Sequence, residues 1–161
     1  MEVAAMTEMN PDIGMNVTIG STHPKPRDGR LSATRRRILI VDDNVDAADS
    51  LHALLMLQGH ETCVVYRGAD ALAAFRSQPF DLALIDIRMP GMDGYQLVHH
   101  MRAAGAALPV IVAVTGLADK ASRGKAQEAG FEYYLVKPYE VEALEAILEC
   151  RTERYSGRGA E

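Results

Sequence analysis

Acidic residues stand at the ends of two short apolar runs, and a hydroxyl and an amine stand at the ends of two others. Asp42 and Asp43 end the run RILIVDD, and Asp86 ends FDLALID. Thr115 falls at the end of the run LPVIVAVT, and Lys137 ends FEYYLVK. Carboxylates held close together repel one another, and burial raises the cost of charging them, so three of them need a cation. A hard divalent ion such as Mg²⁺, which binds carboxylate and carbonyl oxygens and water, suits this set.

The same side chains are suited to binding a phosphoryl group. Mg²⁺ leaves coordination positions for phosphate oxygens, and the Lys137 ammonium and the Thr115 hydroxyl would contact the remaining oxygens. Once the group is neutralised and oriented, a carboxylate oxygen of Asp86 can act as the nucleophile, and the product is an acyl phosphate. This chemistry requires a fold that brings residues far apart in the sequence to one place.

Strands and helices are predicted to alternate from residue 37 onward. Short apolar runs rich in β-branched residues favour strands that are buried on both faces of a parallel sheet. The segments between them have helical spacing, with Asp or Asn at the start of the first helix and Gly59 at its end. The predicted strands are 37–43, 61–66, 80–86, 108–116 and 131–137, and the predicted helices are 44–60, 68–77, 93–105, 118–130 and 139–150.

Apolar residues at helical spacing indicate the buried face of each helix. The helix at 118–130 has Gly124 near its middle and little but alanine as an apolar stripe, so we expect it to be the most weakly anchored. The predicted buried stripes of the other helices are Val45, Ala48, Leu51 and Leu55; Leu72 and Phe75; Tyr95, Val98 and Met101 or their near neighbours; and Val141, Leu144 and Leu148.

This alternation predicts a doubly wound α/β fold, with five parallel strands and helices on both faces of the sheet. The common flavodoxin-like strand order for five strands is 2-1-3-4-5, and ligands bind at the carboxyl ends of the strands, near the switch between strands 1 and 3. With that order, the two acids after the first strand would lie beside Asp86, and Thr115 and Lys137 would follow along the same edge.

Composition sets the limits of the assignment. The chain has 161 residues, of which 48% are hydrophobic, and a formal net charge of −5. We expect a flexible leader at 1–36, one domain at 37–152 and a polar tail at 153–161, with no DNA-binding effector domain after it. The acidic pI, about 5.5, argues against a general nucleic-acid footprint.

No run approaches the length of about 18 apolar residues that a membrane span needs, and no secretory signal is present. We therefore expect a cytoplasmic protein with no membrane partner. Cys63 and Cys150 lack metal-binding or redox spacing, so both are interpreted as reduced thiols. His99 and His100 lie on a predicted helix without an acidic partner at ligand spacing, and we interpret them as surface residues.

Four motifs carry a family resemblance. VDDN, LIDIRMPGMDG, AVTG and YYLVKP, in this order and spacing, resemble the motifs of two-component response-regulator receiver domains, over residues 37–150. The resemblance implies that Asp86 is the phosphoacceptor. It implies that Asp43, Asp86 and the Arg88 main-chain carbonyl bind Mg²⁺ directly, and that Asp42 acts largely through water.

The resemblance also implies roles near the last two strands. Thr115 and Lys137 would contact the phosphoryl group, the Lys137-Pro138 peptide bond would be cis, and Tyr134 would be the switch aromatic. The phosphoryl donor would be a histidine kinase or a histidine phosphotransfer protein, and the output surface would be helix 118–130, strand 131–137 and the last helix. DDNVDAADSLHALL and AGFEYYLVKP are especially similar to receivers of hybrid sensor histidine kinases.

Other readings remain open. A Mg²⁺-dependent phosphohydrolase of the haloacid-dehalogenase type also uses an Asp nucleophile at a strand end, but it needs a second Asp two residues later, where Arg88 stands. An unphosphorylated pseudo-receiver scaffold would require a broken site. A dinucleotide-binding enzyme is excluded because no G-x-G-x-x-G follows the first strand. We expect a signalling phosphoacceptor that catalyses only its own phosphorylation and dephosphorylation.

Two positions depart from the best-known receiver pattern. Arg88 stands where a small amide is found in chemotaxis-type receivers, and Leu117 stands where they have an acid. Both positions flank the path of the hydrolytic water. The lifetime of the phosphorylated state therefore remains open, while its formation does not depend on them.

Overall fold

The computed structural model describes residues 35–116 and 119–155. The predicted alternation of strands and helices is confirmed within this part of the chain, while predictions for the leader up to residue 34, for Leu117 and for 156–161 lie outside it. The strands are β1 Arg37–Val41, β2 Glu61–Val65, β3 Leu82–Asp86, β4 Val110–Thr115 and β5 Tyr133–Val136; the helices are α1 Val45–Leu57, α2 Gly68–Ser77, α3 Gly94–Ala103, α4 Lys120–Ala129 and α5 Val141–Tyr155.

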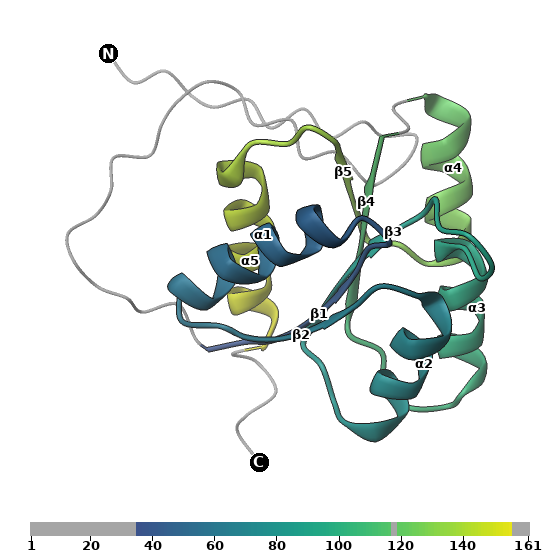
Figure 1. Ribbon diagram of the computed structural model, residues 1–161, viewed down its shortest axis with the longest axis horizontal. Coiled ribbons are helices and arrows are strands. Elements are labelled where there is room, and N and C mark those ends of the chain that lie inside the picture. The colour runs from purple at the N-terminus through teal and green to yellow at the C-terminus, as the bar shows by residue number, and fades with distance from the viewer. Residues whose placement is uncertain (1–34, 117–118, 156–161) are drawn as a thin grey trace.

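The strands form one sheet in the order β2-β1-β3-β4-β5, and every neighbouring pair is parallel. This confirms the predicted doubly wound fold and its strand order. Helices α1 and α5 cover one face of the sheet, and α2, α3 and α4 cover the other (Figure 1). All strands therefore end at the same edge, where the predicted site residues follow them.

Alternation along the strands divides the core into two layers. Ile38 and Ile40 of β1 pack in the layer that holds Leu55 of α1 and residues of α5. Leu39 and Val41 pack in the opposite layer, with residues of α2, α3 and α4. Because β1 lies between two other strands and faces apolar side chains on both sides, every residue between Arg37 and Asp42 is apolar.

The helices begin and end largely as their sequences predict. The side chain of Asn44 caps α1 by accepting a hydrogen bond from the Ala47 amide at 3.1 Å, and Gly59 follows with a φ of 90°, which favours glycine. Asp93 and Gln96 form a capping box at the start of α3. Helix α5 runs to Tyr155, five residues beyond the predicted end at 150.

The predicted stripes hold except at helix starts. Val45 and Val141 are 48% and 38% exposed, and Tyr95 is half-buried, because these residues lie in the first turns, beyond the edge that the sheet covers. Leu97, a near neighbour of Val98, is fully buried, and so is Ile147, which the stripes omitted. In α4 only Ala126 is buried, which agrees with the expectation that this helix has the weakest apolar anchor.

Candidate functional site

Three carboxylates converge where β1 and β3 end side by side. Asp42 and Asp43 follow directly after β1, and Asp86 is the last residue of β3. One carboxylate oxygen from each lies within 4.8 Å of the others. Asp42 and Asp86 are buried, whereas Asp43 is exposed to solvent. Like charges so close together raise the cost of ionisation, and a cation or hydrogen-bond donors must offset that cost.

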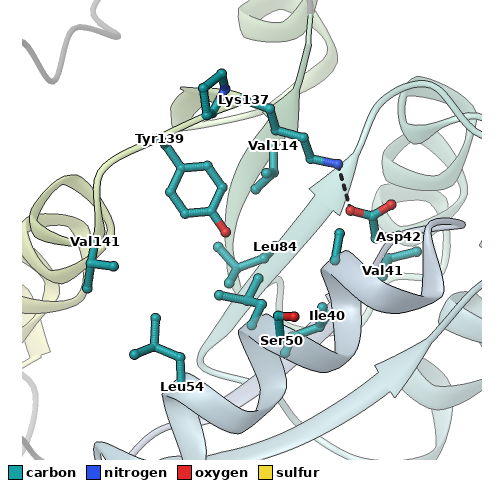
Figure 2. A pocket seen from close by; sticks show the side chains of 13 residues that line it. Ile40, Val41, Asp42, Ser50, Leu54, Leu84, Val114, Lys137, Tyr139 and Val141 are labelled. Atoms are coloured by element: carbon teal, nitrogen blue, oxygen red, sulfur yellow. Dashed lines mark hydrogen bonds and ion pairs between the residues drawn. The ribbon is translucent and has the colours of Figure 1, made fainter.

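Lys137 supplies such a cation from the segment after β5. Its Nζ donates to Asp42 Oδ2 at 2.7 Å and to Asp86 Oδ2 at 3.3 Å. Figure 2 shows the lysine reaching across from the far strand toward Asp42. Its backbone amide donates to the Thr115 carbonyl at 2.8 Å, so the hydrogen bonding that continues beyond β4 and β5 fixes the root of the side chain.

Backbone donors orient the two buried acids. The Asn44 amide donates to Asp42 Oδ1 at 2.9 Å, and the Arg88 amide donates to Asp86 Oδ1 at 3.0 Å. Each acid thus presents one oxygen to its own turn and the other to Lys137. Such hydrogen bonds stabilise the ionised carboxylate and restrict its rotation.

Gly94 allows the chain to return close to Asp86, and sequence reasoning did not single it out. Its amide donates to the Ile87 carbonyl at 2.9 Å. A Cβ atom at this position would lie 2.8 Å from the Ile87 Cα and 2.9 Å from the Asp86 carbonyl oxygen. Only glycine fits this close approach of α3 to the end of β3. The Asp-Gly pair at 93–94, a capping residue followed by a glycine, was the available signal.

Ionisation of the site follows from this balance of burial and charge. Burial raises the pKa of Asp86 to about 6, and the charge of Asp42 adds to this rise, although Lys137 and the Arg88 amide oppose it. Burial by itself lowers the pKa of Lys137, but the hydrogen bond to Asp42 and the charges of both acids raise it above its ordinary value. The lysine therefore remains protonated at neutral pH.

The other predicted residues lie along the same edge and behind it. Thr115 ends β4 and is fully buried. Tyr134 of β5 is 8% exposed, and the Arg123 guanidinium lies 5.5 Å from its ring centroid. The peptide bond between Lys137 and Pro138 is cis, as the family resemblance implies. The side chain of Arg88 is exposed.

The site residues fit a hard divalent cation. Carboxylate oxygens from three acids lie close together, and the ammonium of Lys137 already neutralises part of their negative charge. Mg²⁺ accepts such oxygen ligands and keeps several waters. The acids at 42, 43 and 86 are the residues that could hold it.

A pocket of about 380 Å³ opens beside the acids, between α1 and the segment that leads into α5. Lys137 and Asp42 lie at one end, and Tyr139, Leu54 and Val141 surround the other (Figure 2). Its walls are mostly apolar side chains of β1, β3, β4 and α1. This recess gives another molecule access to the edge that carries the acids.

The remaining residues with reactive side chains lie apart from this site. His99 and His100 are exposed on α3, in agreement with their interpretation as surface residues. Cys63 is a half-buried free thiol on β2 whose pKa is raised by burial. The side chain of Cys150 lies outside the described part of the chain.

Comparison with known proteins identifies the class to which this fold and site belong. The family model of the response regulator receiver domain matches residues 38–149. The chain therefore belongs to the response regulator receiver domain family, as its four motifs indicated. None of the helices in the described part of the chain has both the length and the apolar character of a membrane span.

Individual relatives show how far the likeness extends. The transcriptional regulatory protein ZraR of Salmonella typhimurium is 36% identical over 124 residues, which cover 77% of this chain and 28% of that protein. TctD, another transcriptional regulatory protein of that organism, is 36% identical over 122 residues, covering 76% of this chain and 54% of TctD. The chain thus spans less than two thirds of the length of these curated relatives.

Solved structures show the same fold. A CheY-like receiver domain protein from Methanospirillum hungatei superposes with a TM-score of 0.70 at 28% identity, covering 78% of this chain and 100% of that one. A CheY-like receiver domain from Methylobacillus flagellatus gives a TM-score of 0.64 at 33% identity, covering 73% of this chain and 98% of that one.

The raised pKa of Asp86 predicts a pH-dependent gain in stability for Asp86→Asn. At pH 7 and without divalent cations, the folded state bears the cost of a charged Asp86, and the variant removes it, so the free energy of unfolding rises by about 1–2 kcal/mol. As the pH falls through 6 the folded wild type takes up the proton, so the gain shrinks, and it vanishes near 3.8, the ordinary pKa of an aspartic acid in the unfolded chain.

Urea unfolding in a chelator-containing buffer at several pH values measures this difference. The matched control is Asp81→Asn, which removes a carboxylate at the opposite end of β3. If Asp86→Asn does not raise the free energy of unfolding at pH 7, or if the increase grows toward pH 5, then the charged Asp86 carboxylate does not destabilise the folded state.

Proposed function

We propose that the chain is the phosphorylatable receiver of a two-component phosphorelay, in which Asp86 accepts a phosphoryl group from a phosphohistidine. The donor is a histidine kinase or a histidine phosphotransfer protein. The observation that carries the proposal is the Lys137 ammonium held between two buried acids, Asp42 and Asp86, at a carboxylate cluster. The family match supports it.

The transfer moves the phosphoryl group from nitrogen to oxygen. A carboxylate oxygen of Asp86 attacks phosphorus, the P–N bond breaks, and the imidazole nitrogen keeps the electron pair. Mg²⁺ held by the acids at 42, 43 and 86 and by the Arg88 carbonyl would neutralise phosphoryl oxygens. The Lys137 ammonium would give up a hydrogen bond to a carboxylate and donate one to a phosphoryl oxygen instead. The Thr115 hydroxyl would donate a hydrogen bond to a second phosphoryl oxygen.

Alternative functions meet a specific obstacle at position 88. A phosphohydrolase of the haloacid-dehalogenase type needs a carboxylic acid there to protonate the leaving group, and an arginine does not give up its proton at neutral pH. An unphosphorylated scaffold would not need the lysine between the acids. The chain would therefore act as a regulated binding module rather than as an enzyme with turnover on other substrates.

We further propose bounds and a setting for the receiver. It would extend over residues 37–152, between a leader and a polar tail. The chain would act in the cytoplasm through protein partners and without contacting nucleic acid itself, although ZraR and TctD are named as transcriptional regulatory proteins.

Phosphorylation of Asp86 predicts a mass change that depends on magnesium. Incubation with acetyl phosphate and Mg²⁺ should add one phosphoryl group, because neutralised oxygens and an unprotonated carboxylate are both needed. Intact-mass spectrometry measures the product. Asp86→Asn and a chelator should each abolish the gain, and Asp81→Asn should leave it unchanged. Equal phosphorylation of Asp86→Asn would refute the assignment.

If α4, β5 and α5 form the surface that signals phosphorylation, we expect hydrogen exchange to change in these elements. Tyr134 is already nearly buried, so if Thr115 moves toward the phosphoryl group, the packing with the ring inward becomes more populated at the expense of the other packing. Amide exchange with and without beryllium fluoride, a phosphoryl mimic, should then differ at 119–149. A change limited to the α3 face at 95–104 would contradict the proposal.

Because Arg88 and Leu117 stand at the two variable positions, we expect the phosphoryl group on Asp86 to be hydrolysed slowly. Hydrolysis needs a water in line with the Asp86–phosphorus bond, and neither side chain can accept a proton from it. The variant Arg88→Asn with Leu117→Glu should lose the group roughly tenfold faster or more, followed as decay of labelled phosphoprotein. An unchanged or slower decay would instead mean that Arg88 stabilises the transition state.

A further inference from the structure

Helix α4 is attached to its neighbours through cationic side chains that lie on aromatic rings. Its only buried residue is Ala126. The Arg123 guanidinium lies 5.5 Å from the ring centroid of Tyr134 in β5, and the Lys125 ammonium lies 4.4 Å from that of Tyr95 in α3. Cations at these distances are attracted by the negative face of the ring. These contacts take the place of the missing apolar stripe.

The two rings differ in what they connect. Tyr95 packs edge-on against Phe131 with centroids 6.2 Å apart, and its hydroxyl donates to the Ser122 carbonyl at 3.3 Å. Tyr134 is nearly buried and pairs in register with Ala113 of β4, two residues before Thr115. Of the two cation–ring contacts, therefore, only that of Arg123 with Tyr134 joins α4 to the strand pair that ends at the proposed site.

Arg123 makes this contact without full hydrogen bonding. Its Nε is buried, and among the described residues it has no hydrogen-bond partner. A buried donor without a partner costs free energy, and the ring contact offsets part of that cost. The contact exists only while the Tyr134 ring occupies its inward position. A packing that carries such a cost is suited to a switch between two packings.

Neither charge in the pair depends on pH near neutrality. Burial raises the pKa of Tyr134 to about 12, while Arg123 opposes this rise, and arginine stays protonated in proteins. Asp119, the acid that faces this region from the start of α4, is held by the amide and hydroxyl of Ser122. The guanidinium is therefore a constant positive charge above a neutral ring.

We propose that Arg123 is a positioning residue for phosphoryl acceptance, because it stabilises the inward packing of Tyr134 and thereby the arrangement of α4, β4 and β5 that favours a phosphorylated Asp86. This inference rests on the proposed function. If the phosphorylated state favours the inward ring, linkage requires that a residue stabilising that ring also tightens the binding of a phosphoryl mimic at Asp86.

The test measures the affinity of the full chain for beryllium fluoride in the presence of Mg²⁺, by NMR titration. Arg123→Met keeps an unbranched side chain as far as the position of Nε and removes the charged end, and it should weaken binding about three- to tenfold, as expected for one cation–π contact. Arg123→Lys should recover part of the affinity. The matched control is Lys125→Met, which removes the contact on Tyr95 and should change binding less than about twofold.

Two further readouts separate positioning from a general effect on α4. The ring current of Tyr134 should shift the Arg123 Nε proton in the wild type, and this shift should increase with beryllium fluoride. In a Tyr134→Leu background, Arg123→Met should have no additional effect on affinity, because the residue acts through the ring.

The outcomes for Arg123 and for the site can be told apart. Unchanged affinity in Arg123→Met, or equal losses in Arg123→Met and Lys125→Met, would overturn the inference and leave the proposed function standing. A wild-type chain that binds no beryllium fluoride with Mg²⁺ would overturn the proposed function, and the inference with it. A loss specific to Arg123→Met, absent in the Tyr134→Leu background, would support the inference.

Discussion

Repulsion among the carboxylates at the sheet edge, and its compensation by Lys137, ties the domain together. Asp42 and Asp86 are buried beside each other, and the lysine that bonds to both follows β5, which is separated from β3 by β4. The balance therefore requires that β1, β3, β4 and β5 all run parallel in this order. If any of these strands ran in the opposite direction, its charged residue would lie at the other edge of the sheet, and a buried charge would be left uncompensated.

This compensation also determines how the site can respond. The ammonium of Lys137 donates to one oxygen of each buried acid, and backbone amides hold the other two oxygens. A further cation that binds here would replace some of the hydrogen bonds between Lys137 and the acids, because the acids are already paired with the lysine. Under the proposed function, the lysine released from Asp86 is then available for a phosphoryl oxygen.

Much of this could be predicted from the sequence, because strand ends are clear signals. An apolar run that stops at an acid predicts both a buried strand and the edge at which it ends, and the alternation of strands and helices predicts the topology. The contacts of Arg123 with Tyr134 and of Gly94 with the end of β3 were not predictable in this way. They depend on the distance between elements, which spacing along one helix does not encode. Val45 and Val141 follow the helical period but lie beyond the edge of the sheet, so they are exposed.

Helices α3 and α4 lie on the same face of the sheet but are anchored to it to different degrees. Helix α3 has a capping box and four buried residues, Gly94, Leu97, Val98 and Met101, so displacing it would expose apolar surface at a high cost. Helix α4 buries only Ala126 and relies on cation–π contacts that weaken gradually as the rings move. Helix α4 follows the end of β4, where Thr115 lies, and leads into β5, which Lys137 follows. The helix with the fewest buried residues on this face is therefore the one that connects the two strands carrying these site residues.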